Sequence, residues 1–121
     1  MAKSILIVDD EYVVVEISKR KLEERGYEVY TAGNGNEAFK CLKEKIPDLI
    51  LLDVQMPEMN GYSFIVEKLK IPEYADIPVV VLTAYNEIEP LFQRHGVMAY
   101  LLKPLKLQDV IKKVVEIVGQ P

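Results

Sequence analysis

Short apolar runs recur along the chain, and each is separated from the next by a stretch whose apolar residues have a helical spacing. Three runs are continuous, those in SILIVD, DLILLD and PVVVLT, which is typical of strands buried on both faces of a parallel sheet. The run YEVYT alternates, as a half-buried edge strand does, and MAYLLK is a shorter apolar run. The pattern therefore predicts five strands, at residues 4–9, 27–31, 48–53, 78–83 and 98–103.

The segments between these strands predict helices. In the last segment, one helical face carries the apolar residues Val110, Ile111, Val114, Val115 and Val118. Comparable patterns predict helices at residues 11–25, 36–45, 61–70 and 107–119. Strands that alternate with helices form βαβ units with right-handed crossovers, which place helices on both faces of a parallel sheet. The predicted fold class is therefore doubly wound α/β, in one domain over residues 1–121.

The composition fits one soluble domain and excludes several classes of protein. A length of 121 residues suffices for a single hydrophobic core, and the net charge of −4 argues against direct binding of nucleic acid. The single cysteine, Cys41, cannot form an internal disulfide and fits a reducing compartment. The N-terminal residues lack the pattern of a signal peptide, and no apolar run has the length of a membrane span. We therefore expect a cytoplasmic domain that binds neither nucleic acid nor membranes.

Polar residues end four of the five predicted strands. Asp9 and Asp10 end the first strand, and Asp53, Thr83 and Lys103 end the third, fourth and fifth. Taken singly, each has an ordinary explanation, since aspartate caps helices, threonine starts turns and a lysine before proline can be solvated. Parallel strands, however, end at the same edge of a sheet, where ligands of doubly wound folds bind. Four complementary strand ends therefore favour a functional site at this edge.

The three aspartates, the threonine and the lysine have the chemistry of a phosphoryl-transfer site. Clustered carboxylates repel one another, and some take up protons unless a cation is nearby. Lys103 supplies one positive charge, and Mg²⁺, which prefers oxygen ligands and shares them with phosphate, can supply the rest. An aspartate can then act as a nucleophile and form an aspartyl phosphate. Asp53, carried at the end of a buried strand, is the candidate nucleophile, and Thr83 is a candidate hydrogen-bond donor.

Four motifs in a fixed order resemble those of one known family. The chain contains ILIVDDE, DLILLDVQMPEMNGYSF, PVVVLTAY and YLLKP, which together resemble the response-regulator receiver domain of two-component signalling. The resemblance covers essentially the whole chain. It implies a flavodoxin-like fold with five parallel strands in the order 2-1-3-4-5 and five helices on two faces. It also implies a phosphorylation-dependent switch that catalyses only its own phosphorylation and dephosphorylation, rather than an enzyme acting on an external substrate.

The resemblance assigns a role to the residues of the acidic site. Asp53 becomes the phosphoacceptor, charged by a phosphohistidine of a sensor histidine kinase or of a histidine phosphotransfer protein. Asp10 and Asp53 are expected to bind Mg²⁺ directly, and Asp9 to bind it through water. The main-chain carbonyl of Gln55 is expected to complete the protein ligands.

The same resemblance implies how the site communicates with partners. Thr83 and Lys103 are expected to contact the phosphoryl group, and the Lys103–Pro104 peptide bond to be cis. Thr83 would move toward the phosphoryl group while Tyr100, the switch aromatic, turns inward behind it. An ordinary half-buried strand aromatic is the simpler explanation of Tyr100, but its spacing before Lys103 favours the switch. The change would remodel the face of the fourth helix, fifth strand and fifth helix, which would engage a downstream effector, an output domain outside this sequence or a second copy of the chain.

The segment between Thr83 and Lys103 departs from the family pattern. It is slightly shorter than usual, and Pro90 falls where the fourth helix should run. Proline inside a helix costs ~3 kcal/mol but is harmless at the first helical position. We therefore expect a short fourth helix from Pro90 to Gly96, after a loop at residues 84–89. This places the usual output face in question but leaves the phosphorylation site untouched.

Other functions compatible with this fold fit the residues less well. A Mg²⁺-dependent aspartyl-phosphate phosphatase usually has a second aspartate two residues after its nucleophile, whereas Gln55 stands there in this chain. A flavin-binding protein would need a phosphate-cradling loop after the first strand, which here leads into Asp-Asp-Glu. A degenerate receiver that binds partners without phosphorylation stays open: the altered fourth helix favours it, and the full set of site residues opposes it.

Overall fold

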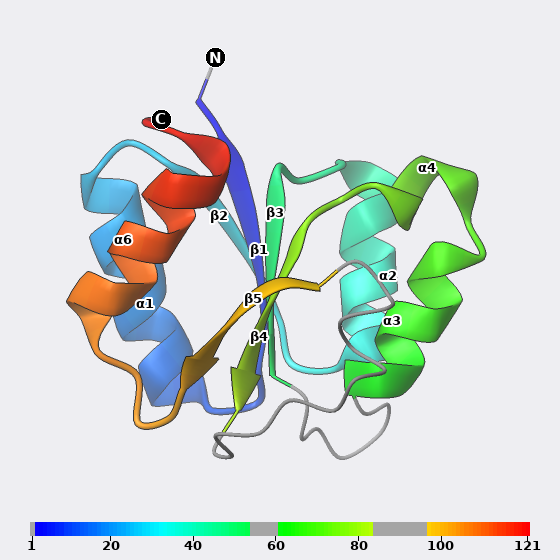
Figure 1. The fold of residues 1–121 in the computed structure, drawn as a ribbon, viewed down its shortest axis with the longest axis horizontal. Coiled ribbons are helices and arrows are strands. Elements are labelled where there is room, and N and C mark those ends of the chain that lie inside the picture. The colour runs from blue at the N-terminus through cyan, green and yellow to red at the C-terminus, as the bar shows by residue number, and fades with distance from the viewer. Residues whose placement is uncertain (1, 54–60, 84–96) are drawn as a thin grey trace.

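A five-stranded parallel sheet forms the centre of the protein, in a computed structural model that describes residues 2–53, 61–83 and 97–121 (Figure 1). The strands are β1 (Ser4–Val8), β2 (Glu28–Ala32), β3 (Leu49–Asp53), β4 (Val79–Thr83) and β5 (Val97–Leu102). They lie in the order β2-β1-β3-β4-β5, and every neighbouring pair is parallel. The predicted strands and their order are confirmed, with ends that differ by no more than one residue.

The described part of the chain has five helices, and the apolar pattern predicts four of them. These four are α1 (Tyr12–Glu24), α2 (Gly35–Glu44), α3 (Gly61–Leu69) and α6 (Leu107–Val118). The pattern does not predict α4 (Pro72–Ala75), which is too short to show a helical period. Its one signal is Pro72, because proline is favoured at the first position of a helix. The predicted helix at 90–96 and the loop at 84–89 lie outside the described residues.

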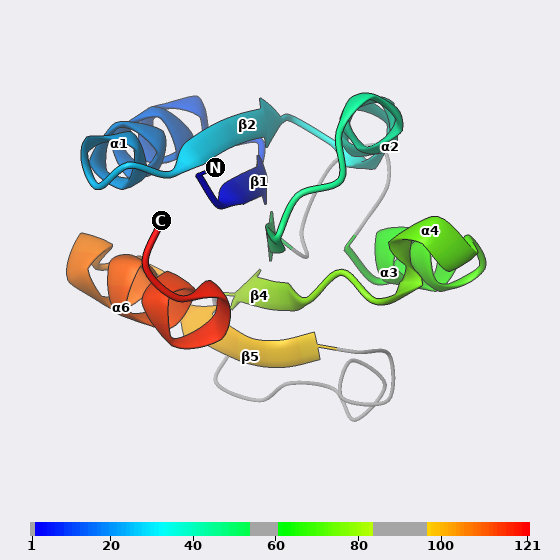
Figure 2. The same ribbon diagram turned by 90° about the horizontal axis from the view of Figure 1, so that it is seen from above.

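The helices form a layer on each face of the sheet, as predicted. Figure 2 shows α1 and α6 on one face and α2, α3 and α4 on the other. None of the helices in the described ranges is long and apolar enough to cross a membrane.

Alternating residues of the inner strands supply two separate cores. In β1, Leu6 and Val8 join the core beneath α2 and α3, whereas Ile5 and Ile7 join the core beneath α1 and α6. Because side chains alternate across a strand and both faces are covered, the inner strands are apolar at every position except Ser4, which begins β1, and Asp53 and Thr83, which end β3 and β4. Each fully buried aliphatic side chain stabilises the fold by about 1.5–3 kcal/mol. This explains the continuous apolar runs in the sequence.

The two edge strands are less buried than the inner ones. In β2, Glu28 and Tyr30 point to solvent. In β5, Met98, Tyr100 and Leu102 are exposed and alternate with half-buried residues. Edge strands pack on one side only, which is why both lack the fully buried pattern of β1, β3 and β4.

Candidate functional site

The carboxyl ends of the parallel strands meet at one edge of the sheet, the lower edge in Figure 1. Asp53 and Thr83 are the last residues of β3 and β4, and Asp9 and Lys103 directly follow β1 and β5. Main-chain hydrogen bonds fix two of these ends: Asp9 N donates to Ala32 O at 3.0 Å, and Lys103 N donates to Thr83 O at 2.7 Å. The sheet itself therefore brings the predicted residues to one edge.

Three carboxylates form a compact cluster at this edge. Asp9, Asp10 and Asp53 each offer one oxygen, and these oxygens all lie within 4.8 Å of one another. Asp9 and Asp53 are buried, with 4% and 3% of their surface exposed, whereas Asp10 is exposed. The cluster therefore has two buried members and one that opens to solvent.

The carboxylate of Asp9 is only partly satisfied. Its Oδ1 accepts a hydrogen bond from Glu11 N at 3.0 Å. Its buried Oδ2 has no hydrogen-bond partner among the residues that the structure describes, although Lys103 Nζ lies 3.5 Å away. Burial raises the pKa of Asp9 to about 6, and the charge of Asp53 adds to this, against the Glu11 hydrogen bond and the Lys103 charge. The surroundings of Asp9 therefore disfavour its charged form.

Lys103 is the cation that faces the cluster. Its Nζ lies 2.6 Å from Glu11 Oε1, 3.4 Å from Asp53 Oδ2 and 3.5 Å from Asp9 Oδ2. Burial alone would lower the pKa of Lys103, but the hydrogen bond to Glu11 and the charges of the carboxylates outweigh it and raise the pKa. The ammonium therefore stays charged beside Asp53.

Glu11 is a member of the site that sequence reasoning missed. Its position in the DDE motif reads as the start of the first helix, and it does stand at the N-cap of α1. Its side chain makes no capping hydrogen bond and reaches Lys103 instead. No sequence signal identifies this contact, since the two residues are 92 positions apart.

Of the remaining predicted residues, the structure describes Thr83, Tyr100 and the Lys103–Pro104 bond but not Gln55. Thr83 is buried at the end of β4, next to the end of β3. Tyr100 lies on β5 opposite Val81 and is 42% exposed, so its ring is on the outer side of the strand. The Lys103–Pro104 bond is cis, as the resemblance implies. Gln55 lies outside the described residues.

The donor atoms of the cluster fit a hard divalent cation. All three side chains present carboxylate oxygens, and Mg²⁺ prefers a few such ligands together with water. A cation at this point would also satisfy the buried Oδ2 of Asp9 and offset the repulsion among the carboxylates.

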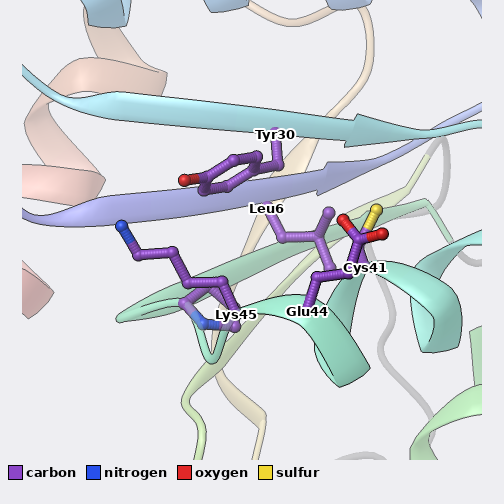
Figure 3. A pocket seen from close by; sticks show the side chains of 6 residues that line it. Leu6, Tyr30, Cys41, Glu44 and Lys45 are labelled. Carbon is purple, nitrogen blue, oxygen red and sulfur yellow. The ribbon is translucent and has the colours of Figure 1, made fainter.

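A separate hollow of about 280 Å³ lies between β2 and α2 (Figure 3). Leu6, Tyr30, Cys41 and Lys45 are among the residues that line it, and Lys45 Nζ lies 5.6 Å from the Tyr30 ring centre. Lys45 is already paired with Glu28, and burial raises the pKa of the Cys41 thiol, which makes it less reactive. The carboxylate cluster is therefore the better candidate for a functional site than this hollow.

Comparison with known proteins gives a match over most of the chain. Residues 5–115 match the family model described as the response regulator receiver domain. The sporulation initiation phosphotransferase F of Bacillus subtilis is 31% identical over 118 residues, which cover 93% of this chain and 94% of that protein. The probable transcriptional regulator ycf27 of Pyropia yezoensis is 41% identical over 86 residues, 71% of this chain. The match spans only 34% of the length of that regulator.

Solved structures share the fold. The chemotaxis response regulator CheY4 of Vibrio cholerae has a TM-score of 0.91 and 27% identity, over 97% of this chain and 99% of that one. The response regulator TrrA of Thermotoga maritima, solved in complex with Mg(2+)-BeF, has a TM-score of 0.82 and 33% identity, over 95% and 98% of the two chains. Since the family match, the relatives and the structures agree, the chain belongs to the response regulator receiver domains of two-component systems.

Proposed function

We propose that this receiver is a phosphorylation-dependent switch that accepts a phosphoryl group from a phosphohistidine onto Asp53. One observation carries the proposal: the buried Asp53 carboxylate ends β3 with an ammonium 3.4 Å away and two further carboxylates within 4.8 Å. Such clustering of like charges lowers stability and is characteristic of functional sites. A purely structural ion pair would need one carboxylate, not three.

In the proposed reaction, a carboxylate oxygen of Asp53 attacks the phosphorus of the phosphohistidine. An O–P bond forms, the N–P bond breaks, and its electron pair returns to the imidazole of the donor. Charge spreads over the phosphoryl oxygens in the transition state, so catalysis consists mainly of positioning and charge neutralisation. Lys103 supplies a positive charge beside Asp53, and Thr83, on the adjacent strand end, would supply a hydroxyl donor.

Asp9, Asp10 and Asp53 would hold a Mg²⁺ ion, with Asp9 acting through water and the main-chain carbonyl of Gln55 as a further ligand. The ion would neutralise phosphoryl charge and orient its oxygens. The oxygen-only donor set and the unsatisfied Oδ2 of Asp9 support this assignment. The presence of Mg(2+)-BeF in the structure of the relative TrrA supports it further. In this account the chain catalyses only its own phosphorylation and dephosphorylation.

The proposed switch needs two kinds of partner, one that donates the phosphoryl group and one that responds to it. A sensor histidine kinase or a histidine phosphotransfer protein would donate the phosphoryl group. A downstream effector, an output domain or a second copy of the chain would bind the face formed by β5, α6 and the predicted helix at 90–96. The exposed ring of Tyr100 lies on this face, where an inward turn coupled to Thr83 would change the surface. Phosphorylation acts on the partner only as far as it favours the altered state.

Intact-mass spectrometry after incubation with acetyl phosphate tests this proposal. We expect one phosphoryl adduct in the presence of Mg²⁺ and none after its removal with EDTA. Asp53→Asn should give no adduct, whereas the matched control Asp109→Asn, an exposed aspartate of α6, should behave as the wild type. No adduct on a folded wild-type protein, from acetyl phosphate or from a phosphohistidine donor, would instead identify a degenerate receiver.

A further inference from the structure

Among the described residues, Glu11 makes the shortest contact with the site lysine. The distance from Lys103 Nζ to Glu11 Oε1 is 2.6 Å, against 3.4 Å to Asp53 and 3.5 Å to Asp9. Charge-assisted hydrogen bonds are short, typically about 2.7–2.9 Å between donor and acceptor. The Glu11 contact is a hydrogen bond at the short end of this class, whereas the other two contacts are longer ion pairs. In this structure the ammonium is therefore bound mainly to Glu11.

The position of Glu11 is fixed by its main chain. Its N–H donates to Asp9 Oδ1 at 3.0 Å, and its carbonyl accepts from Val15 N at 3.0 Å in the first turn of α1. Its side chain is not used to cap the helix and is 53% exposed. Among the described residues, Lys103 is the hydrogen-bond partner of the Glu11 carboxylate. Its fixed main chain holds it beside Lys103, and its exposure to solvent allows the contact to be exchanged for water.

We propose that Glu11 holds Lys103 in the unphosphorylated protein and competes with the phosphoryl group for its ammonium. This rests on the proposed function, since a phosphoryl group on Asp53 would draw Lys103 toward the acidic cluster. Each phosphorylation then exchanges one contact of Lys103, to Glu11, for another, to a phosphoryl oxygen. Glu11 is thus a positioning residue that sets how readily the site takes a tetrahedral anion.

The proposal predicts tighter anion binding when the contact is removed. Glu11 is the exposed partner of this ion pair. Ion pairs at the protein surface contribute roughly 0.2–1 kcal/mol, which corresponds to about a 1.4- to fivefold change in affinity. Glu11→Gln should therefore bind beryllofluoride, a tetrahedral phosphoryl analogue, up to about fivefold more tightly at saturating Mg²⁺.

Glu11→Asp distinguishes an effect of the contact with Lys103 from an effect of the negative charge at position 11. It keeps the negative charge but is one methylene shorter, and aspartate at an N-cap tends to bond the helix instead. If Glu11 acts through its contact with Lys103, Glu11→Asp should bind the analogue as tightly as Glu11→Gln. If it acts only by repelling anions, Glu11→Asp should bind as the wild type does, and the proposal is wrong.

The measurement is a beryllofluoride titration followed by ¹⁹F NMR at saturating Mg²⁺, on the wild type, both Glu11 variants and Glu73→Gln. Glu73 is an exposed carboxylate in α4, so its variant controls for net charge and should match the wild type. Weaker binding by both Glu11 variants would also overturn the proposal, because it would mean that Glu11 helps Lys103 to meet the anion. Absence of binding in every protein would count against the proposed function instead, and the two failures are therefore distinguishable.

Discussion

The Asp9 carboxylate is almost fully buried, with one oxygen bonded to Glu11 N and the other lacking a hydrogen-bond partner among the described residues. A carboxyl in this position favours its protonated form, and its pKa of about 6 follows from burial first and from the nearby Asp53 charge second. Burial of the Asp9 charge therefore lowers the stability of the metal-free fold, and a bound cation would relieve this cost.

We predict that Asp9→Asn stabilises the metal-free protein at pH 7.5. The pKa of Asp9 is raised from 3.8, so its contribution to stability is lost as the pH rises through about 6. Removing the charge should raise the free energy of unfolding by about 1–3 kcal/mol at pH 7.5 and by less at pH 5. Urea unfolding followed by circular dichroism measures this. The exposed Asp10 is the matched control, and an Asp9→Asn protein no more stable than Asp10→Asn would contradict the prediction.

The buried amine of Lys68 is expected to make the stability of the fold depend on pH in the alkaline range. Lys68 is fully buried in α3, and its Nζ donates to Ala75 O at 3.0 Å, at the end of α4. Burial lowers the pKa of this amine below 10.5, against the charge of Asp76. The folded state therefore releases the proton at a lower pH than the unfolded state does, so stability rises with pH in the interval between the two values.

The comparison that isolates this effect is between the wild type and Lys68→Met. As the pH rises from 8 toward 10.5, the wild type should gain free energy of unfolding relative to the variant, because the variant lacks the titrating group. Urea unfolding at several alkaline pH values measures the difference. A difference that stays constant over this range would show that burial does not shift the amine.

A long-range hydrogen bond links two elements of the fold. The Tyr27 hydroxyl, just before β2, donates to Gly119 O at 2.6 Å, which joins the turn after α1 to the end of α6. Tyr27 is otherwise buried in the core beneath these two helices.

Tyr27→Phe should therefore destabilise the protein by about 0.5–1.5 kcal/mol, since it removes one hydrogen bond and keeps the apolar ring. Tyr12→Phe is the control, because the Tyr12 side chain is 75% exposed. Thermal unfolding of the two variants side by side gives the test. Equal melting temperatures would mean that the bond to Gly119 contributes nothing.

How far elements could be predicted depends on their length and burial. The inner strands were predictable because both faces of β1, β3 and β4 are covered, which demands a run of apolar residues in the middle of each strand. The helix α4 could not be predicted from periodicity, because four residues do not complete a repeat. A lysine such as Lys68 is expected at the surface from the sequence, whereas the structure buries it and bonds its Nζ to Ala75 O of α4.

For the whole molecule, strand direction explains why the site could be predicted at all. Once the sheet is parallel, the residues after each strand must meet at one edge, whatever the loops do. The structure accordingly brings together Asp9, Asp10, Asp53 and Lys103. The contact between Glu11 and Lys103 depends on how two chain segments 92 residues apart approach each other, and no periodicity encodes that.

Cation binding should appear as a stability change of the whole domain. A ligand present at ten times its dissociation constant adds about 1.4 kcal/mol to the free energy of unfolding. We therefore expect Mg²⁺ to raise the melting temperature of the wild type by a few degrees, and to do so much less in Asp53→Asn. Potassium chloride at matched ionic strength controls for screening. An equal rise in melting temperature in both proteins would show that Mg²⁺ does not bind at Asp53.

The position of the phosphoryl group on the chain decides whether Asp53 is the phosphoacceptor. Borohydride reduces an aspartyl phosphate to homoserine, so tandem mass spectrometry of the reduced and digested protein identifies the modified position. After phosphorylation in the presence of Mg²⁺, we predict homoserine at position 53 alone and no conversion in samples without Mg²⁺. Conversion at another aspartate, or none in a protein that carries the adduct, would contradict the assignment of Asp53 as the phosphoacceptor.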